Sequence, residues 1–372
     1  MSFKIETGAV TIIGGGPAGA ATAIALRELK IPCIVIDCQQ EDVFKPGESL
    51  APNVNPLLKQ LRIDTTMLTG NHHAWHGNAV VWGRNKIEWR YFIKESFGNG
   101  WHLDRIFFEK QLREIAESRG VTWIEKCRFS HVEKNAGKLM VTVTNRNGSY
   151  MDFETSFLVD CSGRKSCVAN KMKVRRRTMD NLTAYCITAD ATENALRGVS
   201  FIEAVRDGWW YAAPLKNKKV ILSFMSDADL HKVQPANMVQ WYTEKIKETK
   251  HLGEQAGICA DFHHGNIQVR TATTSFIEKP AGKNWLALGD AMCSFDPLTS
   301  FGITRSLSDS VIAAIAIKEA IQGNYRRLIF FIGQQQFRFN RTTAMLFHQY
   351  QLEQRWTGEA FWKRRHASAT AP

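Results

Sequence analysis

Three glycines near the start of the chain have the spacing of residues that bind a diphosphate. Gly14, Gly16 and Gly19 follow a short β-branched run, and Pro17 stands where the first turn of a helix is expected. Gly14 permits a tight turn, Gly16 lets a pyrophosphate approach the backbone, and Gly19 lets the helix pack closely on the strand. The N-terminus of that helix, including Ala18, would face the phosphate charge. This spacing predicts a nucleotide diphosphate site.

An acidic residue follows at the distance that such a site requires. The apolar run 33–36 is expected to form a second strand that ends at Asp37, 23 positions after Gly14. A carboxylate there can accept hydrogen bonds from an adenosine ribose. The glycines alone could also form a turn without a ligand. The strand, helix, second strand and terminal acid together indicate a dinucleotide site.

A second stretch in which a strand leads through a turn to the start of a helix lies between residues 284 and 303. A strand is expected to deliver Gly289 and Asp290, a loop passes Pro297, and a helix begins near Gly302 and Ile303. The N-terminus of this helix would carry partial positive charge, which suits a flavin ring that becomes anionic on reduction.

Further elements must position these residues. Asp104 is a suitable N-cap for a helix with an apolar stripe, and the chain from Tyr325 onward is helical and basic. Other helices are expected at 52–61 and 236–248. Strands are expected between 121 and 158, at 157–160, between 181 and 225, and at 267–276.

Composition limits the classes of function. Lys and Arg number 48 against 36 Asp and Glu, a formal charge of +12 that favours an acidic partner. The basic residues lack the aromatic interleaving of a nucleic-acid platform, and the longest apolar helical run is too short to cross a bilayer. The first residues leave no room for a secretory signal, and the eight cysteines form no C-x-x-C pair. We therefore expect a cytoplasmic protein without nucleic-acid or membrane partners.

The chain contains one cluster of candidate metal ligands, the histidines His72, His73 and His76. No acid or cysteine stands at ligand spacing beside them, so they are interpreted as surface or pocket-lining imidazoles and no metal is expected.

The glycine motif, the segment Asp160–Arg164 and the Gly289-Asp290…Pro297 motif, in this order, resemble the flavoprotein monooxygenases of the p-hydroxybenzoate hydroxylase fold. The resemblance implies FAD as cofactor and an α/β (α+β) fold. Its parts would be a Rossmann-like FAD-binding domain of the glutathione-reductase type, an interleaved β-sheet substrate domain and a helical C-terminal segment. The expected divisions are 1–66, 99–175 and 277–325 for FAD binding, 67–98 and 176–276 for the substrate domain, and 326–372 for the C-terminal segment.

Within that fold, two motifs are similar to the tryptophan-halogenase-like branch. The segment Lys45–Leu50 is similar to its G-E-S-L loop, and Gly208–Leu215 falls where halogenases have G-W-x-W-x-I-P-L. The chain departs from halogenases in Tyr211 for the second Trp and Ala213 for the Ile. Thr299 stands where tryptophan halogenases carry a glutamate, and no counterpart of the halogenase lysine is found between residues 50 and 101.

A better match is to the flavoproteins that mature cysteine tryptophylquinone oxidases, of the glycine- and lysine-oxidase maturation type. The shared motifs are W-G at residue 82, G-W-H-L-D-R at 100–105, G-W-W-Y-x-A-P-L at 208–215 and a closing R-W…F-W-x-R-R at 355–365. The resemblance implies a monooxygenase that oxygenates a tryptophan side chain in the precursor of a quinoprotein amino-acid oxidase, through a flavin hydroperoxide. Molecular oxygen would be the co-substrate, and electrons would come from NAD(P)H or a flavin reductase.

The expected site residues follow from both arguments. The residues expected to bind FAD are Gly14, Gly16, Pro17, Ala18, Gly19, Asp37, Ser49, Arg105, Gly289, Asp290, Pro297, Gly302 and Ile303. The expected substrate-pocket walls are Trp82, Trp209, Tyr211 and Pro214, since aromatic faces can stack on an indole or a flavin, and core packing is the alternative role for these residues. No general base can be named.

Two other functions stay open. One is a flavin-dependent hydroxylase or halogenase of a small aromatic or indole metabolite, and the other is a non-catalytic flavoprotein chaperone of the precursor. In the protein-modifying interpretation, the basic surface and the Trp- and Arg-rich tail would dock an acidic partner.

Overall fold

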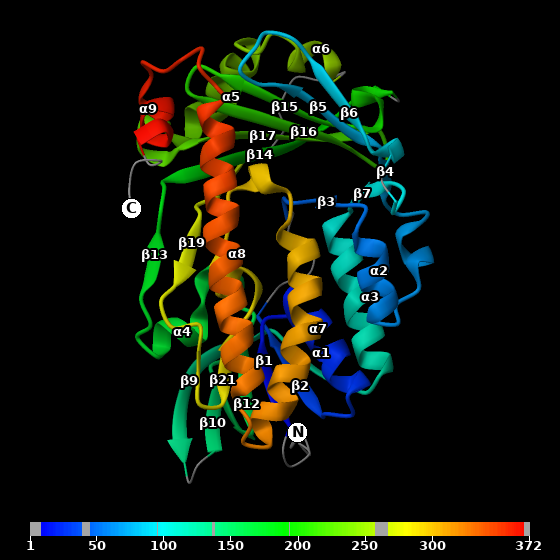
Figure 1. Ribbon diagram of the computed structural model, residues 1–372, viewed down its shortest axis with the longest axis vertical. Coiled ribbons are helices and arrows are strands. Elements are labelled where there is room, and N and C mark those ends of the chain that lie inside the picture. The colour runs from blue at the N-terminus through cyan, green and yellow to red at the C-terminus, as the bar shows by residue number, and fades with distance from the viewer. Residues whose placement is uncertain are drawn as a thin grey trace.

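The computed structural model describes residues 9–38, 45–94, 96–135, 138–192, 194–256 and 267–367. A mixed six-stranded sheet forms the lower half of the molecule in Figure 1. In order along the sheet, its strands are β20 (Ala281–Gly282), β21 (Trp285–Ala287), β12 (Phe157–Asp160), β1 (Val10–Ile13), β2 (Cys33–Asp37) and β8 (Thr122–Glu125). All neighbours are parallel except the edge strand β20, as in a Rossmann-like sheet.

Helix α1 (Pro17–Glu28) is almost wholly buried because small residues let it approach its neighbours. It packs against α3 (Arg105–Ser118) and α7 (Gly302–Ile321). The contact with α7 includes a hydrogen bond from Thr22 Oγ1 to Ser310 Oγ of 2.9 Å. Two segments nearly 300 residues apart therefore form one layer, as expected for a fold that joins both ends of the chain.

A seven-stranded sheet forms the upper half of the molecule (Figure 1). Its strands, in order, are β18 (Gln268–Thr271), β14 (Leu182–Asp190), β17 (Lys219–Asp227), β16 (Gly208–Leu215), β15 (Ser200–Val205), β5 (Gly77–Val81) and β6 (Glu88–Tyr91). Residues of α5 (Met238–Lys247) and α6 (Leu252–Gln255) cover one face. Residues of α8 (Arg326–Gln351) and α9 (Ala360–Ala367) cover the other.

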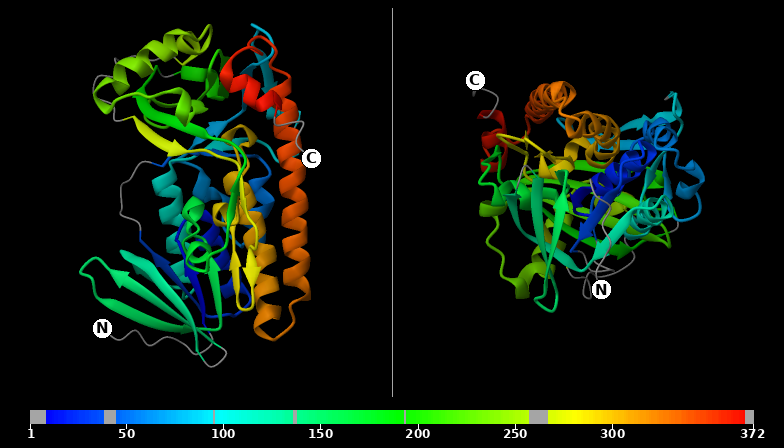
Figure 2. Two further views of the ribbon diagram at one scale, coloured as in Figure 1. Left: turned by 90° about the vertical axis from the view of Figure 1, so that its left-hand side faces the viewer. Right: turned by 90° about the horizontal axis from the view of Figure 1, so that it is seen from below.

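Three small sheets complete the fold. The sheet of β3 (Ser49–Leu50), β7 (Gly100–His102) and β4 (His73–Trp75) lies between the two large sheets (Figure 1). A meander of β9 (Cys127–Asn135), β10 (Lys138–Asn145) and β11 (Tyr150–Thr155) projects at the lower end in Figure 2. The third sheet contains β13 (Arg176–Thr178), β19 (Ser275–Ile277) and β22 (Cys293–Ser294), and two short helices are α2 (Val54–Gln60) and α4 (Cys167–Lys171).

Most expected elements are present, and one expectation is wrong in its arrangement. The stretch 267–276 forms two strands, β18 and β19, in different sheets rather than one strand. The bend between them carries the chain from the seven-stranded sheet into the sheet of β13, β19 and β22. Helix α8, shown in orange-red, runs alongside both halves (Figures 1 and 2).

Seven cysteines in the described ranges are free thiols, and Cys259 lies outside those ranges. None of the helices in the described ranges has the length and apolar character needed to cross a membrane. Of the three clustered histidines, His72 is buried and its Nδ1 accepts a hydrogen bond from the Asp104 backbone N–H at 3.0 Å. No group of metal-ligating side chains occurs among the described residues.

Candidate active site

The residues expected to bind a dinucleotide lie at one edge of the six-stranded sheet. Gly14 follows β1, Asp37 ends β2, and the 3-10 helix η8 (Gly289–Ala291) begins shortly after β21. These strands are parallel, so their carboxyl ends meet at the same edge. Ligands of open α/β sheets bind outside this edge.

The glycine backbone has the geometry that a diphosphate site requires. Gly14 has a φ of +105°, and a Cβ there would lie 2.4 Å from the Cys161 carbonyl oxygen. A Cβ on Gly19 would lie 1.9 Å from the Gly14 oxygen, so strand and helix are in closest contact at this point. A Cβ on Gly16 would meet nothing within 4 Å. The one glycine that should face a phosphate therefore faces open space.

The first turn of α1 also suits an anion. Gly16 is its N-cap, no side chain caps it, and the turn contains no acidic residue. Its backbone N–H groups, including that of Ala18 after Pro17, have no side-chain acceptor, and the helix dipole favours a negative charge there. The Asp37 carboxylate lies beside Gly15, because a Cβ on Gly15 would come within 2.6 Å of Asp37 Oδ2. These observations fit the diphosphate and ribose of FAD.

Two further predicted FAD residues are held by ion pairs. Asp290 is partly exposed and lies 3.4 Å from the Arg305 guanidinium and 3.6 Å from that of Arg164. Arg105 pairs with Glu109 at 2.5 Å and donates to the Gly47 carbonyl at 2.7 Å. The buried Nε of Arg105 has no hydrogen-bond partner among the described residues, so it is available to a polar atom of a cofactor.

The N-terminus of α7 resembles that of α1. Pro297 opens the 3-10 helix η9 (Pro297–Thr299), Gly302 is the first residue of α7, and Ile303 is buried behind it. No side chain caps α7, and a Cβ on Gly302 would meet nothing within 4 Å. This free N-terminus can stabilise negative charge on a nearby ring.

A polar network connects the sheet of β3, β7 and β4 to the seven-stranded sheet. Its members are Glu48, Ser49, His102, Ser200 and Tyr211, and we call this network the junction. The Tyr211 hydroxyl on β16 lies 2.6 Å from Ser49 Oγ on β3 and 3.4 Å from Ser200 Oγ on β15. Ser200 Oγ in turn lies 2.9 Å from His102 Nε2 on β7. The Glu48 carboxyl group lies near this hydroxyl, and the two groups influence each other's pKa. Strands from two sheets, the seven-stranded sheet and the sheet of β3, β7 and β4, thus meet at one hydroxyl group.

Burial favours the uncharged forms of all three titratable members of this network. It raises the pKa of Glu48, although hydrogen bonds from Tyr211 and the backbone oppose the shift. It raises the pKa of Tyr211 well above its ordinary value, and the nearby Glu48 charge adds to this effect. Burial lowers the pKa of His102 well below its ordinary value. The buried Nδ1 of His102 has no partner among the described residues.

The other predicted pocket walls lie in the core. Trp209 is completely buried and its Nε1 donates to the Tyr350 hydroxyl at 2.9 Å. Trp82 Nε1 donates to the Gln349 carbonyl at 2.9 Å, and Pro214 is buried within β16. Trp82 and Trp209 line neither of the two cavities described below. Packing against α8 and α9 explains why the indoles of Trp82 and Trp209 are buried.

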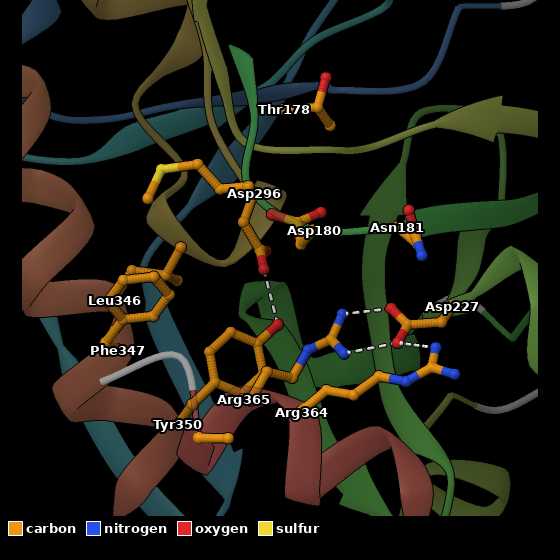
Figure 3. A pocket seen from close by; sticks show the side chains of 12 residues that line it. Thr178, Asp180, Asn181, Asp227, Asp296, Leu346, Phe347, Tyr350, Arg364 and Arg365 are labelled. Carbon is orange, nitrogen blue, oxygen red and sulfur yellow. Dashed lines mark hydrogen bonds and ion pairs between the residues drawn. The ribbon is translucent and has the colours of Figure 1, made fainter. Parts of the chain in front are cut away.

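Two cavities lie along the inner side of α8. One of about 470 Å³ lies between α8, α9 and the end of β17 and is lined by Asp227, Asp296, Tyr350 and Arg365 (Figure 3). The Tyr350 hydroxyl donates to Asp296 Oδ2 at 2.6 Å. The second, of about 290 Å³, lies between α2, α7 and α8.

The expectation that the Trp- and Arg-rich tail forms an exposed docking surface is wrong. Phe361 and Trp362 are completely buried against the seven-stranded sheet. Arg365 is also buried and forms hydrogen bonds of 2.6 and 2.9 Å with Asp227. Arg364 is half-exposed and pairs with Asp227 and Asp229 (Figure 3). The tail covers an apolar sheet face, and its charges are neutralised there.

The profile of the tryptophan halogenase family matches residues 69–372. The chain belongs to the tryptophan halogenase family. It is therefore a flavin-dependent enzyme, and its cofactor is FAD.

Three similar proteins place the chain within this family. An FAD-dependent oxidoreductase of Marinomonas mediterranea, LodB, is 25% identical over 96% of both chains. The myxobacterial chondrochloren halogenase CndH has the same fold, with a TM-score of 0.86, 19% identity and coverage of 96% of this chain and 86% of that one. The peptidyl tryptophan dihydroxylase QhpG, essential for tryptophylquinone biogenesis, superimposes with a TM-score of 0.75, 22% identity and coverage of 96% and 78%.

Sequence reasoning missed several residues of this site. Glu48 and His102 entered the sequence analysis only as parts of motifs, and Ser200 did not enter it. Their signal was weak because the three residues are 54 to 152 positions apart in the sequence and meet only when two sheets pack together. Asp296 and Tyr350 were overlooked for the same reason.

Proposed function

We propose that this enzyme is a monooxygenase that oxygenates a tryptophan side chain within a precursor protein during the biogenesis of cysteine tryptophylquinone. The observation that carries the proposal is the match to the Marinomonas oxidoreductase, which extends over 96% of both chains. The similarity in fold to a peptidyl tryptophan dihydroxylase supports the same class of substrate.

The residues around the junction suit this reaction better than halogenation. Thr299 takes the place of the halogenase glutamate and has no carboxylate; its hydroxyl donates to the Asp296 carbonyl at 3.0 Å. Between residues 50 and 101, the lysines whose side chains the structure describes, Lys59 and Lys86, are exposed at the surface. An electron-rich indole needs little activation, so positioning and exclusion of water would be the main tasks of the protein.

The proposed roles of the chain's residues follow from their positions. The first turn of α1 at Gly16–Gly19 would hold the diphosphate, Asp37 the ribose, and Arg105 and Asp290 the remaining polar groups of FAD. Pro297, Gly302 and Ile303 would border the flavin ring. Reduced FAD supplies an activated oxygen atom when O₂ and an electron donor, NAD(P)H or a flavin reductase, are present.

The buried network would then fix the substrate side of the site. Ser49 and Tyr211 connect the FAD side to the seven-stranded sheet, so the ring and the indole would be held at a constant separation. The raised pKa of Tyr211 keeps its hydroxyl protonated and able to donate a hydrogen bond. We assign Tyr211 a positioning role on this basis, and Trp82, Trp209 and Pro214 support it from the core.

Halogenation or hydroxylation of a small aromatic metabolite is the second candidate, because the family profile and the fold of CndH favour it. Turnover of free indoles would identify this class, and a dependence of the product on chloride or bromide would identify a halogenase.

The test is co-expression with a candidate precursor, followed by intact mass and peptide mapping. We expect a gain of one or two oxygen atoms on one tryptophan. Gly16→Glu should abolish the gain because its side chain would occupy the open space before α1. Gly358→Glu, which adds the same charge at an exposed glycine with nothing within 4 Å, is the matched control. A stable complex with bound FAD and no mass change would refute oxygenation and indicate a chaperone.

A further inference from the structure

Helix α8 has an outer face that is unusual for a surface helix. Phe330 is 65% exposed, Phe337 67% and Met345 63%. These side chains recur at intervals of seven and eight residues, so they follow one stripe of the helix. Helix α8 has 26 residues, is about 39 Å long and extends over much of the molecule's height (Figures 1 and 2).

The opposite face of α8 is buried against the rest of the protein. Leu328, Phe331 and Phe339 pack into the core of the FAD side, and Leu346 and Tyr350 pack against the seven-stranded sheet. The exposed aromatic residues therefore have no role in holding α8 in place. Exposed apolar patches of this kind mark interaction sites.

The charges on α8 are all of one sign. The helix contains four arginines and no aspartate or glutamate. Arg327 pairs with Glu319 and Arg338 with Asp309. Arg326 and Arg341 lie on the same stripe as Phe330 and Phe337, and within the described part of the chain neither has a carboxylate partner.

This charge pattern indicates which kind of protein could bind to the exposed stripe of α8. A second copy of the helix would bring arginines towards arginines with no acid on either side, which is unfavourable. A partner that presents carboxylates beside apolar side chains would satisfy both features of the stripe. The formal charge of +12 on the whole chain favours the same kind of partner.

The stripe also lies next to the candidate active site. Arg338 and Thr342, which neighbour Phe337 and Arg341 along the helix, line the cavity of about 290 Å³ together with the exposed Phe301 before α7. Phe301 precedes Gly302, whose position at the start of α7 was assigned to the flavin side of the site. A protein seated on the stripe would therefore be close to the loop that we assign to FAD.

We propose that the stripe Arg326, Phe330, Phe337, Arg341 and Met345 docks the precursor protein through an acidic and apolar surface. This inference rests on the proposed function, because it supplies the contact by which a protein substrate is recognised. Hot spots at interfaces are enriched in aromatic residues and arginine, which are the residues that the stripe exposes.

The test uses full-length protein and the precursor that the wild type oxygenates in the co-expression experiment. We expect Phe337→Ser combined with Arg341→Glu to weaken precursor binding about 10- to 100-fold, as for the loss of two hot-spot residues. Tyr150→Ser combined with Arg146→Glu is the matched control, because Tyr150 is equally exposed on the distant meander. Both proteins should keep their FAD and oxidise a short peptide containing the target tryptophan at wild-type rate.

Each other result refutes the inference in a recognisable way. Wild-type affinity for the Phe337/Arg341 variant would exclude the stripe but leave the proposed function intact. A wild-type protein that neither binds nor oxygenates any precursor would exclude both. Loss of a dimer in sedimentation experiments on the variant, with precursor binding unchanged, would identify a second copy as the occupant.

Discussion

Replacing Asp296 with asparagine should remove a specific dependence of the protein's stability on pH. The Asp296 carboxyl group is buried, accepts a hydrogen bond from the Tyr350 hydroxyl at 2.6 Å and another from the Leu298 backbone N–H at 2.8 Å. Burial raises its pKa to about 7, although the hydrogen bond from Tyr350 opposes the shift. The folded protein therefore binds this proton more tightly than the unfolded chain.

The sign and size of the effect follow from this shift. Between the ordinary pKa of 3.8 and the folded pKa of about 7, the unfolded state holds fewer protons, so the free energy of unfolding falls as pH rises. A shift of about 3 units, at about 1.4 kcal/mol each, corresponds to about 4 kcal/mol over the whole window. About 3 kcal/mol of this should be lost between about pH 5 and pH 7, with no further loss above.

Urea unfolding of the wild type and Asp296→Asn at about pH 5 and pH 8 measures the effect, because other titrating groups contribute equally to both proteins. We expect the stability difference between the two proteins to move by about 3 kcal/mol in favour of the variant at the higher pH. A difference that does not change with pH would refute the buried, proton-binding state of Asp296. Tyr350→Phe is the control, since loss of its donated hydrogen bond should extend the pH window upward.

Two further predictions concern the sites on either side of the junction. Gly19→Ala should prevent stable folding, because its Cβ would lie 1.9 Å from a backbone oxygen, whereas Gly16→Ala should change stability by less than about 0.5 kcal/mol. Thermal unfolding compares them, and a stable Gly19→Ala protein would contradict the close strand–helix contact. Tyr211→Phe should cost about 1–3 kcal/mol, because Ser49 and the buried Ser200 each lose a hydrogen-bond partner. Urea unfolding tests this, and Tyr91→Phe at an exposed position is the control that should leave stability unchanged.

The fold around the first strands of the six-stranded sheet was predictable because its signals are local. The 28 positions from Val10 to Asp37 contain a strand, a tight turn, a helix and a second strand, and each residue type has a steric or electrostatic reason at its place. The N-cap role of Asp104 could be predicted in the same way, and its side chain accepts from the Phe107 backbone N–H at 3.0 Å.

The tail was misinterpreted because its environment is formed by distant residues. Composition alone cannot distinguish a solvated arginine from one that is neutralised by an aspartate 138 positions earlier, as in Arg365 with Asp227. Trp362 likewise covers a sheet face whose strands come from the middle of the chain. By contrast, the exposed stripe of α8 is visible in the sequence as an apolar period, but only the structure shows which side of the helix is covered.

The buried titratable groups of the junction bear on the kind of reaction that the site suits. Burial moves the pKa values of Glu48 and Tyr211 upward and that of His102 downward, so each group is biased towards its uncharged form. An indole is uncharged and need not lose a proton before it attacks an electrophilic oxygen, so a site without a strong base or a permanent cation is sufficient for it. A reaction that depended on an ammonium or carboxylate beside the substrate would require a charge where this network disfavours one. The junction therefore suits oxygen transfer to an indole, and a Glu48→Gln variant that retained oxygenation would agree with a neutral carboxyl group at this position.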